Sequence, residues 1–246
     1  MVRILLKNIP QINSLLNVPE EQVHHIVNVR RINIGEEVEC IDYDNNFCRA
    51  CVEEIGKNKV IIRVTGEKTT KEKLPNISLY AALLPEKKMD WIIQKCTEIG
   101  VTELVPILSE FCTAKFHIKN AEKKINRWNK IAEEAARQCG GVPMRVKKPQ
   151  KFEETLQSDA RIKIICEKSG KKLEKTTIFD KKHQKNDKII VLIGPEGGFS
   201  EKEVKKAVNN GWHATSFHQN ILRAETAAVV CCVLVQSKVQ TKKLNL

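Results

Sequence analysis

The sequence predicts an α/β protein in which a small β-rich barrel precedes a larger domain built on a mostly parallel sheet. Up to about residue 65, short alternating runs are separated by turn residues, which is typical of strands. From Ile77 onward, apolar runs alternate with segments of helical spacing. That alternation indicates a parallel sheet with helices on both faces.

In the first region we predict strands near residues 37–41, 48–55 and 59–64. A short helix is expected to begin near Pro19, because proline fits the first turn and the two glutamates that follow favour the positive end of a helix. The polar, proline-containing segment 66–76 is the predicted linker. We therefore assign the domains to residues 1–70 and 75–246.

In the second region, apolar residues recur at helical spacing from Met89 to Ile99 and from Ile125 to Cys139, and glycines follow both segments. Ser200 to Glu203 form a capping box that opens a third helix, which ends near Gly211. A fourth helix begins near Arg223. The predicted strands are 77–84, 102–108, 161–166, 188–193 and 213–217.

The fourth helix is apolar around nearly its whole circumference between Ala227 and Val235. Such a helix must be covered on every side. We therefore expect a homodimer interface to cover it. At nine residues this apolar run is far shorter than the roughly 20 that span a bilayer, and the N-terminus has no signal-peptide pattern. The expected location is cytoplasmic, without a membrane partner.

The net charge of +12 is confined to the second region, since residues 1–75 hold 11 basic and 11 acidic side chains. The excess lies mainly in residues 115–151, with 11 basic and 3 acidic side chains, and 161–188, with 10 and 4. A basic surface of this kind suits a polyanionic partner. A lysine-rich solvated surface without a partner is the alternative.

Nine cysteines without a signal peptide indicate free thiols in a reducing compartment. Cys48 and Cys51 form a Cys-x-x-Cys pair, but no second pair or histidines stand at zinc-ligand spacing. In a strand the two would point to opposite faces. We expect buried thiols and no metal.

The segment from Ile193 to Ser200, IGPEGGFS, joins an apolar strand to a capped helix, where α/β sheets bind ligands. Its glycines let backbone amides approach a ligand closely. It lacks the lysine of a P-loop and the spacing of a dinucleotide fingerprint. Its carboxylate, Glu196, would repel phosphate, so the loop suits an adenosine bearing a cationic sulfonium. A simple glycine-rich connector is the alternative.

A second strand-to-helix junction follows one unit later, with the sequence NILRAETA at 220–227. Arg223, Glu225 and Thr226 would lie at the first turn of the last helix. Helix capping explains Glu225 and Thr226. It does not explain Arg223, because a cation is unfavourable at a helix N-terminus. We expect Arg223 to have a negative partner.

These two motifs resemble those of the RsmE family, the 16S ribosomal RNA uridine-N3 methyltransferases of the SPOUT superfamily. Further similar segments are HIVNVRRINIG from His25, KMDWIIQKCTEIG from Lys88 and RWNKIAEEAARQCG from Arg127. The resemblance covers nearly the whole chain in the same order. It implies a PUA-like N-terminal barrel, a C-terminal domain with a deep trefoil knot, and a homodimer.

The resemblance also implies S-adenosylmethionine as cofactor and 16S ribosomal RNA or the small ribosomal subunit as partner. The reaction would be methyl transfer to N3 of one uridine. The cofactor site would comprise Ile193, Gly194, Pro195, Glu196, Gly197, Gly198, Asn220, Ile221, Leu222 and Thr226, with Cys166 and Glu167 nearby. RNA contacts are assigned to Arg30, Arg31, Arg127 and Arg137.

Methylation at N3 requires that the uracil lose a weakly acidic proton, which a carboxylate can accept and a cation can assist. Glu225 and Glu196 are the candidate bases, and Arg223 is the candidate that stabilises the developing anion or orients the RNA. These three residues form the predicted catalytic set.

The sequence departs from the family pattern at four positions. Phe111 and Gly141 stand where arginines are usual, His218 replaces a glycine, and Arg30 replaces a leucine. The first two put the grip on RNA in doubt. His218 is either a tolerated loop substitution or a new acid–base group.

Two other functions stay open. One is a related SPOUT enzyme that acts on a different RNA or on a ribose hydroxyl. The other is a non-catalytic RNA-binding or assembly factor, against which both intact motifs argue.

Overall fold

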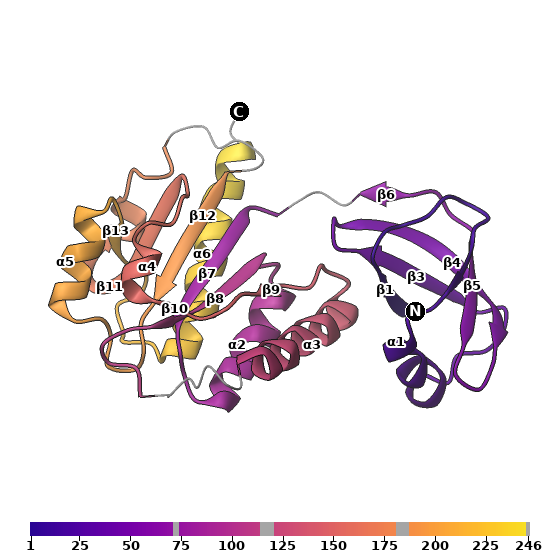
Figure 1. The fold of residues 1–246 in the computed structure, drawn as a ribbon. Helices are drawn as coiled ribbons and strands as arrows, with labels where there is room; N and C mark the ends of the chain where they lie inside the picture. Colours follow the sequence, from indigo (N-terminus) through magenta and orange to yellow (C-terminus); the bar gives the residue numbers. More distant parts are fainter. Residues whose placement is uncertain (71–73, 114–120, 181–186, 245–246) are drawn as a thin grey trace. The chain divides into compact units, whose positions relative to one another are not determined.

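The computed structural model describes residues 1–70, 74–113, 121–180 and 187–244, with the side chains of the last helix described up to residue 240. The chain forms two compact units (Figure 1). The first comprises Met1–Lys73 and Glu133–Pro143, and the second comprises Leu74–Ala132 and Met144–Leu246. The segment Glu133–Pro143, which includes the end of a long helix, thus belongs to the first unit although it lies far beyond the predicted linker.

The first unit contains a six-stranded sheet with the order β1-β3-β4-β5-β2, and β6 pairs with β4. Alternate residues of the strands, among them Val38, Cys40, Ala50 and Ile62, are buried in one core, as expected for strands with one covered face. Within the described residues, no ladder joins β1 to β2. The elements are β1 (Val2–Leu6), β2 (Leu15–Asn17), α1 (Glu20–His24), the π-helical η1 (His25–Val29), β3 (Glu37–Asp42), β4 (Asn46–Ile55), β5 (Val60–Val64) and β6 (Thr69–Thr70).

A side chain from α1 forms hydrogen bonds with the backbone of the edge strand β1. Gln22, only 4% exposed, accepts a hydrogen bond from the backbone N–H of Leu5 (3.0 Å) and donates one to its carbonyl (2.7 Å). The side-chain amide therefore replaces the neighbouring strand that β1 lacks at this point. Pro19, at the N-cap, fixes where this helix begins, as predicted.

We expect Gln22→Leu to lower the free energy of unfolding of the first unit by about 2–3 kcal/mol, because two buried backbone groups each lose a hydrogen bond. Urea denaturation followed by circular dichroism measures the loss. The matched control is Gln11→Leu, at an exposed position, which should stay within about 0.5 kcal/mol of the parent. Equal stability of both variants would show that the edge of β1 needs no side-chain partner.

The second unit contains a sheet in which every ladder is parallel, with the order β10-β8-β7-β12-β11-β13 and β9 paired with β8 (Figure 1). The predicted fold class is confirmed. The elements are β7 (Asn76–Ala82), α2 (Glu86–Glu98), β8 (Glu103–Leu108), α3 (Ala121–Cys139), β9 (Arg145–Val146), β10 (Gln150–Lys151), α4 (Phe152–Thr155), β11 (Ile162–Lys172), the short 3-10 helix η3 (Leu173–Lys175), β12 (Lys188–Ile193), α5 (Glu201–Asn209), β13 (His213–Ser216) and α6 (Ala224–Leu244).

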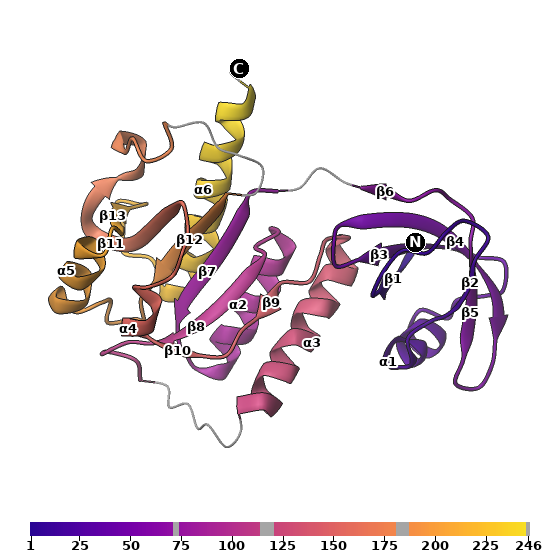
Figure 2. The same cartoon turned by 45° about the horizontal axis from the view of Figure 1, so that its top comes forward.

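Helices cover both faces of this sheet, with α5 and α6 on either side of the strands (Figure 2). In β12, Ile189, Val191 and Ile193 join the core formed with α2, α3 and α6. Ile190 and Leu192 join a second core with α4 and α5. This two-sided burial explains why β12 is a continuous apolar run rather than an alternating one.

Several elements differ in extent from their predictions. The strand expected at residues 161–166 continues to Lys172, and the expected linker contains the two-residue strand β6. The short elements β9, β10 and α4 were not predicted, because two to four residues carry no periodic pattern. The trefoil knot stays a prediction. No helix in the described part of the chain has the length and apolar character that a membrane span requires.

Candidate functional site

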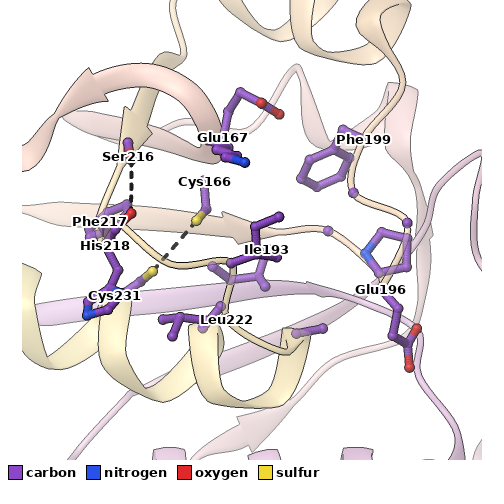
Figure 3. Close-up of a pocket in the computed structure, with 18 of the residues that line it drawn as sticks. Cys166, Glu167, Ile193, Glu196, Phe199, Ser216, Phe217, His218, Leu222 and Cys231 are labelled. Atoms are coloured by element: carbon purple, nitrogen blue, oxygen red, sulfur yellow. Dashed lines mark hydrogen bonds between the residues drawn. The ribbon is translucent and has the colours of Figure 1, made fainter.

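A cavity of about 340 Å³ opens beside Cys166 of β11 and the carboxyl ends of β12 and β13 (Figure 3). The parallel registers pair Ile165 with Leu192 and Cys166 with Thr215, so Cys166 lies level with the ends of β12 and β13. The volume lies at the lower end of the range for ligand sites, roughly 300–1,000 Å³. The lining residues are Cys166, Glu167, Lys168, Ile193, Gly194, Pro195, Glu196, Gly197, Gly198, Phe199, Ser216, Phe217, His218, Asn220, Ile221, Leu222, Ala224, Ala227 and Cys231.

The loop after β12 forms one wall, and its glycines are required by space and backbone conformation. A Cβ at Gly194 would lie 3.1 Å from both the carbonyl carbon of Gly198 and the ring of Phe199. Gly198 has φ +74°, a conformation that residues with a side chain rarely adopt. The loop therefore folds closely on itself, and a larger residue at either position would open it.

A buried carboxylate fixes the end of this loop. Glu203, 5% exposed, accepts the backbone N–H of Ser200 at 2.9 Å, and the Ser200 hydroxyl accepts the N–H of Glu203 in return. The predicted capping box is confirmed. The second oxygen of Glu203 accepts the N–H of Glu110, 2.9 Å away. One side chain thus joins the loop to the turn that follows β8.

An outward bulge of β11 forms the opposite wall. The ladder with β13 reaches Cys166, breaks, and resumes at Lys171 against the same residue, Thr215. The intervening residues form a bulge in this ladder, and two of them, Glu167 and Lys168, line the cavity. At Gly170 the bulge returns so closely that a Cβ would lie 2.6 Å from the backbone of Ala214.

The last wall is the start of α6. Ala224, Ala227 and Cys231 line the cavity at intervals of three and four residues, which is one stripe of a helix. The preceding residues, Asn220 to Leu222, also line it. The two sequence motifs thus meet around one cavity. Thr226, Arg223 and Glu225 are not among its lining residues.

Lys88, on α2, lies between Glu196 and Glu225, the two predicted bases. The sequence alone did not point to it. Its Nζ donates a hydrogen bond to Glu196 at 2.7 Å and lies 3.8 Å from Oε2 of Glu225. That oxygen of Glu225 is buried and has no hydrogen-bond partner among the described residues. Figure 3 shows the carboxylate of Glu196 turned away from Cys166 and Cys231. Its bond to Lys88 lowers the pKa of Glu196.

Arg223 is exposed, and no carboxylate in the described part of the chain forms an ion pair with it. The expected negative partner is therefore not supplied by these residues. A guanidinium without an internal partner is available to a ligand that carries negative charge.

The four arginines assigned to RNA differ in how they are held. Arg127 binds both Asp90, at 2.7 Å, and Glu86. Arg137 binds Glu134. Arg30 and Arg31 are exposed. Of the four, only Arg30 and Arg31 have no carboxylate partner among the residues that the structure describes.

Two residues that depart from the family pattern lie at this site. His218 lines the cavity, and its Nδ1 accepts the backbone N–H of Asn220 at 3.1 Å. This bond holds the turn before α6. Phe111 is 45% exposed, and its Cβ is so close to Gly197 that a Cβ added at Gly197 would lie 3.4 Å from it. It therefore packs beside the loop as an exposed aromatic ring.

No group of three or more potential metal ligands occurs among the residues that can be described. Cys40 and Cys48 face each other across β3 and β4, and both are buried, whereas Cys51 is partly exposed. The three thiols do not form a common site with histidines.

Comparison with known proteins defines the class. A family model described as an RNA methyltransferase domain matches residues 70–236, and one described as an RNA methyltransferase PUA domain matches residues 18–65. The chain is 33% identical to ribosomal RNA small subunit methyltransferase E of Bacillus subtilis, over 86% of this chain and 85% of that one. It is 32% identical to ribosomal RNA small subunit methyltransferase E 2 of Borreliella burgdorferi, over 84% of each chain.

Solved structures agree with the sequence relatives. The enzyme of the same name from Neisseria gonorrhoeae, bound to S-adenosyl methionine, is similar with a TM-score of 0.86 and 26% identity, over 96% of this chain and 97% of that one. A methyltransferase from Legionella pneumophila in complex with the same cofactor gives equal values. The chain therefore belongs to the RNA methyltransferase family, in its small-subunit methyltransferase E (RsmE) branch. The predicted family and the PUA-like domain are confirmed.

We expect Lys88→Met to raise the pKa of Glu196 toward its ordinary value, because the variant removes the hydrogen bond and the ammonium charge that lower it. NMR titration of the labelled carboxylate measures the shift. Lys95→Met is the matched control, since Lys95 is on the same helix but pairs with Glu98. An unchanged pKa in Lys88→Met would show that Lys88 does not hold Glu196.

Proposed function

We propose that this chain transfers a methyl group from S-adenosylmethionine to N3 of a uridine in 16S ribosomal RNA. The observation that carries the proposal is the meeting of the 193–198 loop and residues 220–222 around one cavity, in a chain of this family. Relatives named as ribosomal RNA small subunit methyltransferases support the substrate class, and neighbours bound to S-adenosyl methionine support the cofactor.

The residues around the cavity fit this cofactor. The close approach at Gly194 leaves backbone rather than side chains facing a ligand. Of the charged residues in the lining, Glu167 suits a ligand with a positive charge, whereas Lys168 is basic and Glu196 is paired with Lys88. The predicted contacts from Ile193 to Gly198 and from Asn220 to Leu222 are retained, and Thr226 would act through the first turn of α6. The bound cofactor supplies an electrophilic methyl group.

The chain itself must then accept a proton and balance a negative charge. Glu225 is the better base, because one of its oxygens is buried without a hydrogen-bond partner among the described residues. Glu196 is less suited, because Lys88 occupies its carboxylate and lowers its pKa. Arg223, exposed and without an internal ion pair in the described chain, would stabilise the uracil anion or hold a phosphate.

The proposed RNA contacts and the proposed homodimer depend on exposed residues outside the cavity. Arg30 and Arg31 are available to phosphates, whereas RNA would have to compete with carboxylates for Arg127 and Arg137. A homodimer is supported by the apolar circumference of α6, on which Val229, Val230 and Leu234 are only partly buried and Val233 is 42% exposed. A ribosomal RNA substrate supports action in the cytoplasm. We retain residues 1–70 as an RNA-binding domain and 75–246 as the methyltransferase domain.

The test is methyl transfer from labelled S-adenosylmethionine to small ribosomal subunits that lack this modification, followed by nucleoside mass spectrometry. We expect labelled 3-methyluridine. Free 16S RNA, offered in parallel, identifies which of the two is the substrate. A methylated ribose or another labelled base would contradict the proposed specificity, and a chain that does not bind the cofactor would contradict catalysis itself.

We expect Arg223→Ala to lower the rate of transfer about 100-fold or more, because it removes the cation from the developing anion. Cofactor affinity, measured by calorimetry with S-adenosylhomocysteine, should change less than twofold, since Arg223 does not line the cavity. Arg223→Lys, which keeps the charge, should retain part of the rate. An equal loss of transfer and affinity would instead make Arg223 a cofactor-binding or structural residue.

A further inference from the structure

Two thiols in the cavity wall have no role in the reaction proposed above. Cys166 ends the regular part of β11 and Cys231 lies on α6, and their sulfur atoms are 3.7 Å apart (Figure 3). Both residues line the cavity. Residues 65 positions apart in the sequence are thus brought into contact by the fold, at a wall shared by a strand and a helix.

We propose that Cys166 and Cys231 are a reversible disulfide site, and that the oxidised pair weakens binding of the cofactor. The bond joins the two Sγ atoms directly. The proposed function enters this inference in one place only: it identifies the ligand, S-adenosylmethionine, whose affinity would change. The formation of the bond rests on the positions of the two thiols alone.

The reaction with a peroxide balances in two steps. The Cys166 thiolate attacks one peroxide oxygen and becomes a sulfenic acid, and the other oxygen leaves as water after taking up a proton. The Cys231 thiol then attacks the sulfenic sulfur, a second water leaves, and the disulfide remains. Two thiols have lost two electrons, and hydrogen peroxide has accepted them.

The two cysteines differ in the way these steps require. Cys166 is partly exposed, so a small oxidant in the cavity can reach it, whereas Cys231 is fully buried. The hydrogen bond from Cys231 lowers the pKa of Cys166, and the same bond with burial raises the pKa of Cys231. Cys166 is therefore the nucleophile that meets the oxidant, and Cys231 is the resolving thiol.

The bond changes the shape of the site. A disulfide is about 2.05 Å long, so the two sulfurs must approach by about 1.6 Å from their present separation. Rotation of the two side chains or movement of β11 toward α6 must close that gap, and either one displaces atoms of the cavity wall. With about 340 Å³ in total, the cavity has little space to lose before a ligand of nucleoside size is excluded.

A second pair of thiols provides the internal control. Cys96, on α2, and Cys232, on α6, are fully buried and interact with each other. Neither lines the cavity. An oxidant that enters through the cavity should leave this pair reduced. Disulfides in reducing compartments are typically transient and regulatory, which suits a bond that reducing agents reverse.

The experiment treats the full chain with hydrogen peroxide, maps disulfides by peptide mass spectrometry, and measures S-adenosylhomocysteine affinity before oxidation, after it, and after dithiothreitol. We expect a Cys166–Cys231 bridge, at least a tenfold loss of affinity, and recovery on reduction. Cys96→Ala should behave in the same way as the parent. Cys166→Ala and Cys231→Ala should form no bridge in the cavity wall. Peroxide should therefore leave the affinity of each variant for S-adenosylhomocysteine at its value before oxidation.

Three results would overturn the inference: no bridge between these residues, a bridge at Cys96–Cys232 instead, or a bridge that leaves the affinity unchanged. Failure of the proposed function is distinguishable from these. In that case the reduced parent would not bind S-adenosylhomocysteine at all, while the peptide map would still decide whether the bridge forms.

Discussion

The pairing of β12 between β7 and β11 determines where the functional residues of the second unit lie. β12 pairs with β7 through all six of its residues, and with β11 through Ile165 opposite Leu192. Because both ladders are parallel, the carboxyl ends of these strands reach the same edge. The loop after Ile193 must therefore leave the sheet beside Cys166, and a cavity at that edge follows from the register.

Charged groups then fix the loops that the strands only bring together. Glu203 is buried, and its two oxygens accept backbone N–H groups from different loops, which offsets the cost of burying a carboxyl group there. Lys88 performs a similar function at the surface, between Glu196 and Glu225. Both contacts hold these loops in place in the absence of a ligand, which lowers the cost of ordering them when a ligand binds.

The distribution of basic residues has two physical uses. Some cations form ion pairs within the fold. Arg127 pairs with two carboxylates, and Arg161 pairs with Asp187. Others, such as Arg30, Arg31 and Arg223, are exposed. An ion pair adds nothing to the net charge, so the excess of +12 comes from the remaining cations, and the whole excess attracts a polyanion over a distance.

The sequence by itself determined the fold class, the family and the two motifs, because apolar periodicity, capping residues and glycines are local signals. β12, the helix α5 with its capping box, and the start of α6 near Arg223 were all predictable in this way. Tertiary structure alone decided which distant side chains meet. Lys88 reaches Glu196 across 108 residues and Cys166 reaches Cys231 across 65. Contacts at such separations depend on strand order and helix packing, which no local pattern encodes.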